Sequence, residues 1–530
     1  MSFPTFLNPG IVNMLWSLNL SEWFRARSNT GFSRAVLLFV HAATLLASVD
    51  GTGISEPQKY AMEIIDLNAE NMKQHRRLGP ISGYVQFAGN LVGNTNNGFF
   101  GTSVDIDEFG TTIIVREYGT DTVRVYENTA NQWTQKGQDL TGFPILLSIF
   151  DKTAAISGDG NIVVVSSTTN QVVVFQYDTS TEMWIQRGST IQEVELDGSP
   201  IESFGVSISI SADGDKVAVG APFHDSPTAN NIGFATTYFW NGVINDWERE
   251  TYRDDSNNDV AGLYGELRNA FLGTAVSLSG DGNWFAVGMP GSGISDSDSA
   301  RFGECRVYSS LGLITQSIVN GGAMFGSTVR DNFGYSVALN YDGNIVAVGS
   351  PEFNTLESIL VGKVQVFQRS NTLWVQLGSD LIGDEQFDEF GTSIDLSDDG
   401  KTLVAGSDSG RGYARIYKFD GIDWVLQEIS RAQGFDIDGI REGDELGSVA
   451  VSRDGTKVLV GAIGYDGPDT NNGLVQTWRQ TDFPTFSPIL NPLPQVGNLG
   501  TGGSPGQTNF VSRAFTWWQG AVAYLKDLFN

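Results

Sequence analysis

The chain has 530 residues and a formal net charge of −29, because 61 Asp and Glu outnumber 32 Lys and Arg. Binding to nucleic acid requires a basic face, so this composition argues against a nucleic-acid partner. The single cysteine excludes an intrachain disulfide framework, and three histidines argue against chemistry built on histidine clusters. Hydrophobic residues make up 40% of the chain, which is sufficient for a large core.

The N-terminal region contains one apolar segment, residues 35–49, after a leader of residues 1–34. Arg25, Arg27 and Arg34 precede this segment and Asp50 follows it, an order that leaves the N-terminus in the cytosol and exports the chain downstream of the segment. The segment is shorter than the roughly 20 residues of a spanning helix and resembles the core of a signal peptide. A cleaved signal, a type II membrane anchor and a buried helix of a soluble body all remain open.

Residues 50–80 are interpreted as a polar stalk or linker. Its end contains Arg76-Arg77, which in an exported protein is either a dibasic processing site or a solvated basic tip of the stalk.

One strand-turn-strand unit recurs seven times along the chain, and this repeat is the main structural signal. Alternation such as Ser207–Ile210 predicts strands with one buried face. An Asp-Gly pair or a close variant between the first two strands predicts a tight, two-residue hairpin with positive φ at the glycine. The seven turn glycines are Gly110, Gly160, Gly214, Gly282, Gly343, Gly400 and Gly455.

Each copy continues with a third strand that ends in an aromatic residue and a fourth strand. The fourth strand begins at a tryptophan in five copies, namely Trp133, Trp184, Trp247, Trp374 and Trp424. Four antiparallel strands repeated radially predict an all-β fold, a seven-bladed β-propeller over residues 81–481, with short helical N- and C-terminal extensions. Tyr84–Phe87 matches the fourth-strand pattern of Trp374–Leu377, so we expect it to complete the last blade and close the ring. The main alternative is an open β-solenoid.

The repeat resembles the FG-GAP repeat of integrin α-subunit head domains. The resemblance covers residues 81–481 and is carried by units such as FGYSVALNYDGNIVAVGSP from Phe333. It implies an exported recognition or adhesion module that meets ligands on the face with the inter-blade links and the loops between second and third strands. The calcium motif of that family is missing, since the turn Ser279–Gly282 offers one carboxylate. We therefore expect neither a metal ion nor another cofactor.

Two copies depart from the repeat. Copy two has Asp151 where the glycine of FG is expected, and copy seven is one residue short between Leu446 and Gly455. These departures predict irregular blades.

The candidate ligand-binding residues are acidic and lie in the links and loops of the predicted ligand face. They are Asp384, Glu385, Asp388, Glu389, Asp436, Asp438, Glu442, Asp444, Glu445, Asp296 and Asp298. The functional interpretation is a face that gathers cations or a basic partner. The alternative is a solvated acidic surface that keeps an exported protein soluble.

No catalytic residue is assigned from the sequence. Acidic pairs serve as acid and base in propeller hydrolases, but carboxylates are too abundant here for one pair to be chosen. His224, beside Pro222, is expected to be an exposed loop residue, and Cys305 a small buried side chain. An enzyme would show a central pocket in which two carboxylates with raised pKa converge.

The C-terminal tail consists of a Pro/Gly-rich linker, residues 482–509, and an amphipathic helix, residues 510–530. The apolar side of the helix includes Trp517, Trp518, Val522, Leu525 and Phe529. Such a helix suits a membrane interface or a groove of a partner; the alternative is that it packs back onto the propeller.

Together these observations predict an exported, non-enzymatic recognition or adhesion module that binds a protein or glycan partner through the loops of one propeller face. It would be secreted or anchored as a single-pass type II membrane protein, with the propeller extracellular or lumenal and membrane contacts through 35–49 and 510–530. The alternatives are a hydrolase or lyase acting on extracellular polysaccharide, and a structural subunit of a larger assembly.

Overall fold

The computed structural model describes residues 82–144, 152–167, 169–195, 198–253, 259–260, 262–293, 301–309, 324–371, 373–429, 436–468 and 470–482. The chain divides into two compact units, residues 1–483 and 484–530, and every described residue belongs to the first. The predicted apolar segment, stalk, C-terminal linker and helix, and Asp296 and Asp298, lie outside the described residues. Within those residues, none of the helices has the length and hydropathy needed to span a membrane.

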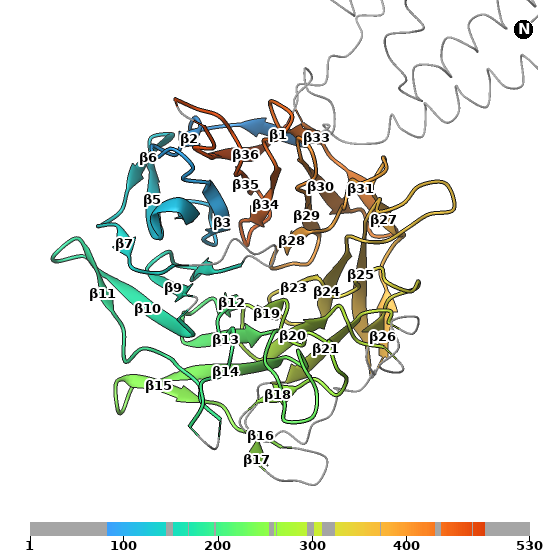
Figure 1. Ribbon diagram of the computed structural model, residues 1–530. Coiled ribbons are helices and arrows are strands. Elements are labelled where there is room, and N and C mark those ends of the chain that lie inside the picture. Colours follow the sequence, from blue (N-terminus) through green and yellow to red (C-terminus); the bar gives the residue numbers. More distant parts are fainter. Residues whose placement is uncertain are drawn as a thin grey trace, which may run out of the picture. The chain divides into compact units, whose positions relative to one another are not determined.

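The described residues form a seven-bladed β-propeller, in which seven antiparallel sheets follow one another around a centre (Figure 1). From the centre outward, blade 1 consists of β3 (Phe100–Ile106), β4 (Thr112–Glu117), β5 (Thr122–Thr129) and β6 (Gln132–Gln135). Blade 2 consists of β8 (Ala154–Ile156), β9 (Ile162–Ser167), β10 (Gln171–Asp178) and β11 (Met183–Gln186). Blade 3 consists of β12 (Ser207–Ile210), β13 (Lys216–Ala221), β14 (Phe234–Asn241) and β15 (Asp246–Arg249).

The remaining blades repeat this order. Blade 4 contains β19 (Val276–Leu278), β20 (Trp284–Met289) and β21 (Glu304–Ser309); the segment after β21, where its fourth strand is expected, lies outside the described residues. Blade 5 consists of β23 (Ser336–Leu339), β24 (Ile345–Ser350), β25 (Lys363–Ser370) and β26 (Leu373–Gln376). Blade 6 consists of β28 (Ser393–Leu396), β29 (Thr402–Ser407), β30 (Tyr413–Phe419) and β31 (Trp424–Leu426). Blade 7 consists of β34 (Leu446–Val451), β35 (Lys457–Ala462), β36 (Leu474–Asp482) and β1 (Ser82–Gln86).

Short strands in the links extend six of the sheets, because each link leaves its blade by pairing with that blade's third strand. They are β2 (Leu91–Val92), β7 (Leu140–Thr141), β18 (Leu263–Tyr264), β22 (Met324–Phe325), β27 (Leu381–Ile382) and β33 (Asp436–Asp438). The other elements are β32 (Glu428–Ile429), parallel to β1, the pair β16 (Tyr252–Arg253) and β17 (Asp259–Val260), and one 3-10 turn, Tyr118–Thr120.

The closure of the ring by the N-terminal strand is confirmed. β1 runs antiparallel to β36, with Tyr84 opposite Gln480 and Gln86 opposite Trp478. The N–H of Phe87 donates to the carbonyl of Thr477 at 2.9 Å. The two ends of the propeller are therefore joined within blade 7, and the alternative of an open solenoid is wrong.

The turn between the first and second strands differs in one respect from the expected two-residue hairpin. The expected positive φ is present at all seven turn glycines, from +62° to +73°. However, the connection contains four residues, since the N–H of Ser211 pairs with the carbonyl of Lys216. The Ser211 hydroxyl donates to Asp213 at 2.5 Å and accepts from the N–H of Lys216. The carboxylate of the turn aspartate therefore accepts a hydrogen bond from within its own turn.

Backbone hydrogen bonds link these turns into a closed ring. The residue two positions before the turn glycine, or the one after that residue, donates its N–H to the corresponding carbonyl of the next blade. The seven donor–acceptor pairs are Glu108–Gly158, Gly158–Ala212, Ala212–Gly280, Asp281–Tyr341, Tyr341–Asp398, Asp398–Arg453 and Asp454–Glu108. Because these bonds use backbone atoms alone, the side chains at this end are free to vary between blades.

Glycines bring neighbouring blades into close contact. A leading glycine follows the first residue of a copy, as in Gly391, and a trailing glycine lies near the end of the second strand, as in Gly349. A Cβ on Gly349 would overlap the carbonyl oxygen of Gly391 in the next blade. The same contact joins Gly220 to Gly273, Gly288 to Gly334, Gly406 to Gly447 and Gly461 to Gly101.

We therefore expect Gly349→Ala to lower the free energy of unfolding by roughly 2–3 kcal/mol, because the new methyl group meets a backbone atom that has no room to move. Gly242→Ala is the matched control: Gly242 has ordinary φ, and its nearest neighbour would be 4.0 Å from the new Cβ. That change should stay within about 0.5 kcal/mol of the original protein. Chemical denaturation of both variants makes the comparison; equal losses would contradict the close contact.

The junction between blades 1 and 2 lacks this glycine pair. Arg116 occupies the trailing position, and Asp151, which lies outside the described residues, takes the leading one. The Arg116 side chain is fully buried, and its guanidinium donates to the carbonyls of Thr153, Phe143 and Ser166 at 2.8, 2.6 and 2.7 Å.

The other predicted irregularity, in copy seven, appears as a register shift between Leu446 and Ser448 where β34 pairs with β35. A similar shift lies in blade 1, between Phe100 and Val104, where the repeat pattern predicts a regular pair of strands.

Candidate functional site

The links and the loops between second and third strands share one face of the propeller, which we call the link face. Parallel bridges show this, since the end of such a loop lies beside the first residue of the next blade, as at Gly362 and Phe390 or Gly412 and Leu446. The opposite face carries the Asp-Gly turns and is called the turn face.

The first strands enclose a central cavity of about 260 Å³. Hydroxyl-bearing side chains provide much of its lining, among them Thr102, Thr274, Tyr335 and Thr392. On the link face the lining includes two carboxylates, Asp408 and Glu445. A cavity of this size accommodates one small group, such as an amino-acid side chain, and not a folded segment.

Arg453 reaches across the turn face of the propeller. Its Nη1 lies 3.0 Å from the position that a Cβ would take on Gly280, and its Nε 3.3 Å from that of Gly158. The side chain therefore extends from blade 7 towards blades 2 and 4, where glycines leave room. It lies 3.6 Å from Asp398 of blade 6.

Burial raises the pKa of Asp398 to about 6, although Arg453 acts in the opposite direction. A carboxyl whose pKa is raised on folding holds its proton more strongly in the folded state. The free energy of unfolding therefore falls as pH rises from about 4 to about 6 and stays reduced at pH 7.

We expect Asp398→Asn to stabilise the propeller at pH 7 by about 1–2 kcal/mol. This is less than the pKa shift alone implies, because the carboxylate is partly exposed and the variant also loses its ion pair with Arg453. Near pH 4, where the carboxyl is largely protonated in the folded protein, the gain should vanish. Denaturation curves at both pH values test this; an equal gain at pH 4 and 7 would contradict it.

One lysine lies inside the cavity. Lys152 is 3.4 Å from Asp105 and keeps 40% of its side-chain surface accessible from the cavity. Burial alone would lower the pKa of Lys152, but the carboxylates of Asp105 and Asp395 outweigh burial and raise that pKa. Lys152 was missed by the sequence analysis; the available signal was a lysine where other copies have Thr102, Thr274 or Thr392.

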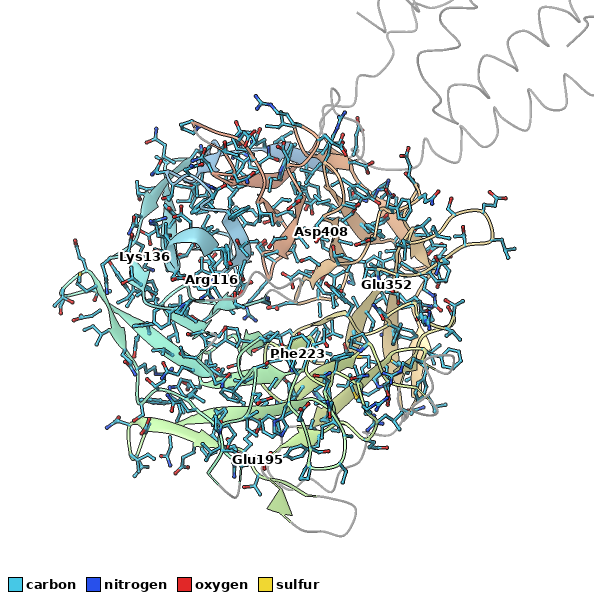
Figure 2. The ribbon with its side chains drawn as sticks, in the orientation of Figure 1. Arg116, Lys136, Glu195, Phe223, Glu352 and Asp408 are labelled. Carbon is cyan, nitrogen blue, oxygen red and sulfur yellow. The ribbon has the colours of Figure 1, made fainter. Side chains whose placement is uncertain are left out.

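Asp408 and Glu445 line the cavity where it opens on the link face, Glu389 interacts with Asp408, and Glu352 interacts with Glu389. We call Glu352, Glu389, Asp408 and Glu445 the mouth carboxylates. Burial raises the pKa of all four. Repulsion from Asp408 raises the pKa of Glu389 and Glu445 further, and Glu352 also acts on Glu389. Figure 2 shows Asp408 closer to the centre of the ring than Glu352, whereas Glu195 lies at the rim.

Two of these four, Glu389 and Glu445, are among the residues predicted from the sequence. Asp408 and Glu352 are not: Asp408 stands where copies three to five have the proline of Gly-x-Pro, and Glu352 follows Pro351. A carboxylate at the proline position of copy six was the one available signal.

Several predicted acidic residues instead organise the links. Arg415, almost buried, pairs with Asp384 at 2.5 Å and with Asp436 at 2.7 Å. Asp388 accepts the N–H groups of Asp384 and Glu385 and the hydroxyl of Tyr413.

Asp444 belongs to the same structural class, because it is buried and accepts the N–H of Arg441. The remaining predicted residues, Glu385, Asp438 and Glu442, are exposed on the link face. Glu442 lies 4.0 Å from the exposed Arg411, a pair that contributes little to stability. In the described parts of the chain, no group of three or more Asp, Glu, His or Cys is arranged to hold a metal ion.

The expectation of an exposed His224 is wrong. Its side chain is buried, and Nε2 lies 2.7 Å from Glu195. The reason is that the rings of Phe234 and Tyr264, on two paired strands of blade 3, pack against the imidazole. Cys305 is buried as expected, and burial raises the pKa of its thiol.

Comparisons with known proteins add little about function. No family model matches the chain, and no curated protein matches it. Among solved structures, hydrazine synthase from Kuenenia stuttgartiensis is similar with a TM-score of 0.45 and 13% sequence identity, over 72% of this chain and 96% of that chain. A similarity this weak is no guide to function.

Proposed function

We propose that this chain is an exported recognition or adhesion module that binds a protein or glycan partner at the mouth of its central cavity. The observation that carries the proposal is the gathering of the mouth carboxylates. Within the described residues, Glu389, Asp408 and Glu445 form no ion pair, although Asp384 and Asp436 beside them share Arg415. The Asp408 carboxyl is hydrogen-bonded to Thr392, but it has no ion-pair partner, and like charges held close together without a counter-charge are typical of a functional site.

Membership of the FG-GAP family is part of this proposal. The paired leading and trailing glycines support it, because the FG and GAP glycines of the repeat are the residues that allow five of the seven junctions to close. The face on which that family meets ligands corresponds to the link face here.

Export is proposed from the sequence alone, on the apolar segment at 35–49 with basic residues before it. N-terminal sequencing of the native protein tests it. A start after residue 49 indicates a cleaved signal and a start after Arg77 indicates dibasic processing. A retained N-terminus on membrane-bound protein indicates the type II anchor, whereas a retained N-terminus on cytosolic protein would contradict export.

Ligand binding is tested with the full chain on glycan and random-peptide arrays. The double variant Asp408→Asn/Glu445→Gln should lose the bound ligands of the original chain. The control Asp342→Asn/Glu182→Gln changes two exposed carboxylates of the turn face and should keep them. Ligands that bind all three proteins equally would contradict a site at the cavity mouth.

A hydrolase or lyase acting on extracellular polysaccharide is the second candidate. The observation that favours it is that Asp408 and Glu445 line a central cavity and both have raised pKa, the arrangement that acid–base catalysis requires. Release of reducing or unsaturated ends from a polysaccharide panel by the full chain, lost in Asp408→Asn, would support catalysis. Equal release by both proteins would indicate a contaminant.

A further inference from the structure

Exposed apolar side chains lie directly beside the mouth carboxylates. We call Leu356, Ile359 and Phe387 the apolar ledge; their relative exposures are 107%, 49% and 49%. The N–H of Phe387 donates to the carbonyl of Ile359 at 3.1 Å, and the N–H of Glu389 donates to the carbonyl of Leu360 at 2.9 Å. The loop of blade 5 and the link to blade 6 therefore run side by side, and one residue, Asp388, separates Phe387 of the ledge from Glu389 of the mouth carboxylates.

Phe387 is unfavourable for the isolated propeller on two counts. Its φ is +68°, in the left-handed region that a bulky residue rarely adopts. The corresponding positions of other links hold Asn97, Asn269, Arg330 and Gly443, of which Asn and Gly suit this conformation. The ring also remains half exposed, so burial does not offset the strain. A phenylalanine kept there is better explained by contact with a partner.

The negative charge around the apolar ledge favours a partner that carries positive charge. Glu357 and Glu385, on the same loop and link, are exposed, and Glu389 of the mouth carboxylates follows Phe387 two positions later. A cationic group would relieve their mutual repulsion, whereas an anionic one would add to it. Inside the cavity Lys152 opposes deeper entry of a cation, so the charged group would stay at the mouth.

We propose that the apolar ledge and the mouth carboxylates together bind a peptide segment of a partner protein in which an apolar residue lies close to a lysine or arginine. The apolar side chain packs on Phe387 and Ile359, and the cation lies among Glu389, Asp408 and Glu445. This inference rests on the proposed function and narrows it to a basic peptide. A neutral glycan would satisfy neither the exposed charge nor the apolar ledge.

The experiment uses a phage-displayed library of random dodecapeptides and the full chain. Selection on the original chain should enrich peptides with Lys or Arg within about four residues of Leu, Ile, Phe or Trp. For a synthetic selected peptide, Phe387→Asn and Asp408→Asn/Glu445→Gln should each weaken binding at least tenfold, measured by fluorescence anisotropy. Acetylation of a selected lysine should have a similar effect, because it removes the charge.

Two controls separate binding from folding. Phe387→Asn introduces the residue found at two corresponding positions, so its melting temperature should be unchanged or higher. Ile422→Asn changes a residue of the turn face that is 84% exposed and should leave binding unchanged. Enrichment without basic residues, or equal binding by all variants, overturns the inference. Glycan binding that depends on Asp408 and Glu445 without any peptide binding would leave the proposed function standing and overturn the basic-peptide inference alone.

Peptide affinity should also rise as the pH increases through the range just above the usual titration of a carboxyl group. The raised pKa of Glu389, Asp408 and Glu445 means that these groups still carry protons at pH values where ordinary carboxylates are ionised. A cation binds the ionised form, so binding releases protons and strengthens as pH increases. Affinity that is independent of pH in this range would contradict a role for these carboxylates.

Discussion

Replacing Tyr84 with alanine should lower the free energy of unfolding of the propeller by roughly 3–5 kcal/mol. The side chain is fully buried in a cluster with Ile429 and Trp478, and its hydroxyl donates to the carbonyl of Gly455 at 2.8 Å. Tyr84 also belongs to the strand that joins the two ends of the ring. Its loss should therefore weaken closure as well as packing.

The matched control is Trp424→Ala, at the corresponding fourth-strand position of blade 6. Trp424 is also largely buried, but blade 6 is continuous in sequence, so its fourth strand does not close the ring. Hydrogen exchange should show lost protection in both blade 7 and blade 1 for Tyr84→Ala, including the N–H of Asp454, which bonds to Glu108. Trp424→Ala should affect its own blade and blade 5. Identical patterns of exchange would show that Tyr84 contributes packing alone.

The seven blades and their closure could be predicted from the sequence because the information is local. Alternation along each strand recurs in every copy, as does the Asp-Gly turn or its variant Phe109-Gly110, and Tyr84–Phe87 repeats a pattern found at Trp374. These signals require only neighbouring residues. The turn length was misjudged because the serine of the turn, such as Ser211, pairs with Lys216 five residues later.

The candidate site could be predicted only in part, because it depends on contacts between distant segments. Glu389 and Glu445 are 56 residues apart in sequence numbering, and their relation to Asp408 becomes visible only when the blades are placed in a ring. In the same way, Asp384 and Asp436 differ from the unpaired carboxylates because they pair with Arg415. No pattern in the sequence shows which acids this arginine will bind. His224 was misjudged for the same reason, since Glu195 belongs to another blade's link.

The scaffold and the site use different kinds of contact. Backbone bonds between turns and glycine pairs between blades hold the ring together. These contacts leave the residue before each blade free to vary, and it is Phe99, Ser203, Phe271, Asn332, Glu389 or Glu445, all with positive φ. The acids of blades 6 and 7 at this position are therefore not required by the fold.

The junction between blades 1 and 2 gives the second large expected effect. Arg116→Met should lower the free energy of unfolding by roughly 3–5 kcal/mol, because it removes a buried guanidinium of blade 1 that holds one carbonyl of the link and two of blade 2. Arg116→Lys keeps the charge but presents a single ammonium instead of a planar fork, so it should recover only a small part of that loss.

Restoring the glycine pair tests whether Arg116 takes the place of the missing glycine contact or only packs at the junction. Arg116→Gly alone should be at least as destabilising as Arg116→Met, since it leaves an unfilled space. The double variant Arg116→Gly/Asp151→Gly recreates the glycine pair that closes five other junctions. Its free energy of unfolding should exceed that of Arg116→Gly by at least about 1 kcal/mol. A difference of this size is larger than the usual error in adding the effects of two mutations. Chemical denaturation of the four variants provides the comparison. A double variant no more stable than Arg116→Gly would show that Arg116 supports this junction by contacts unrelated to the missing glycines.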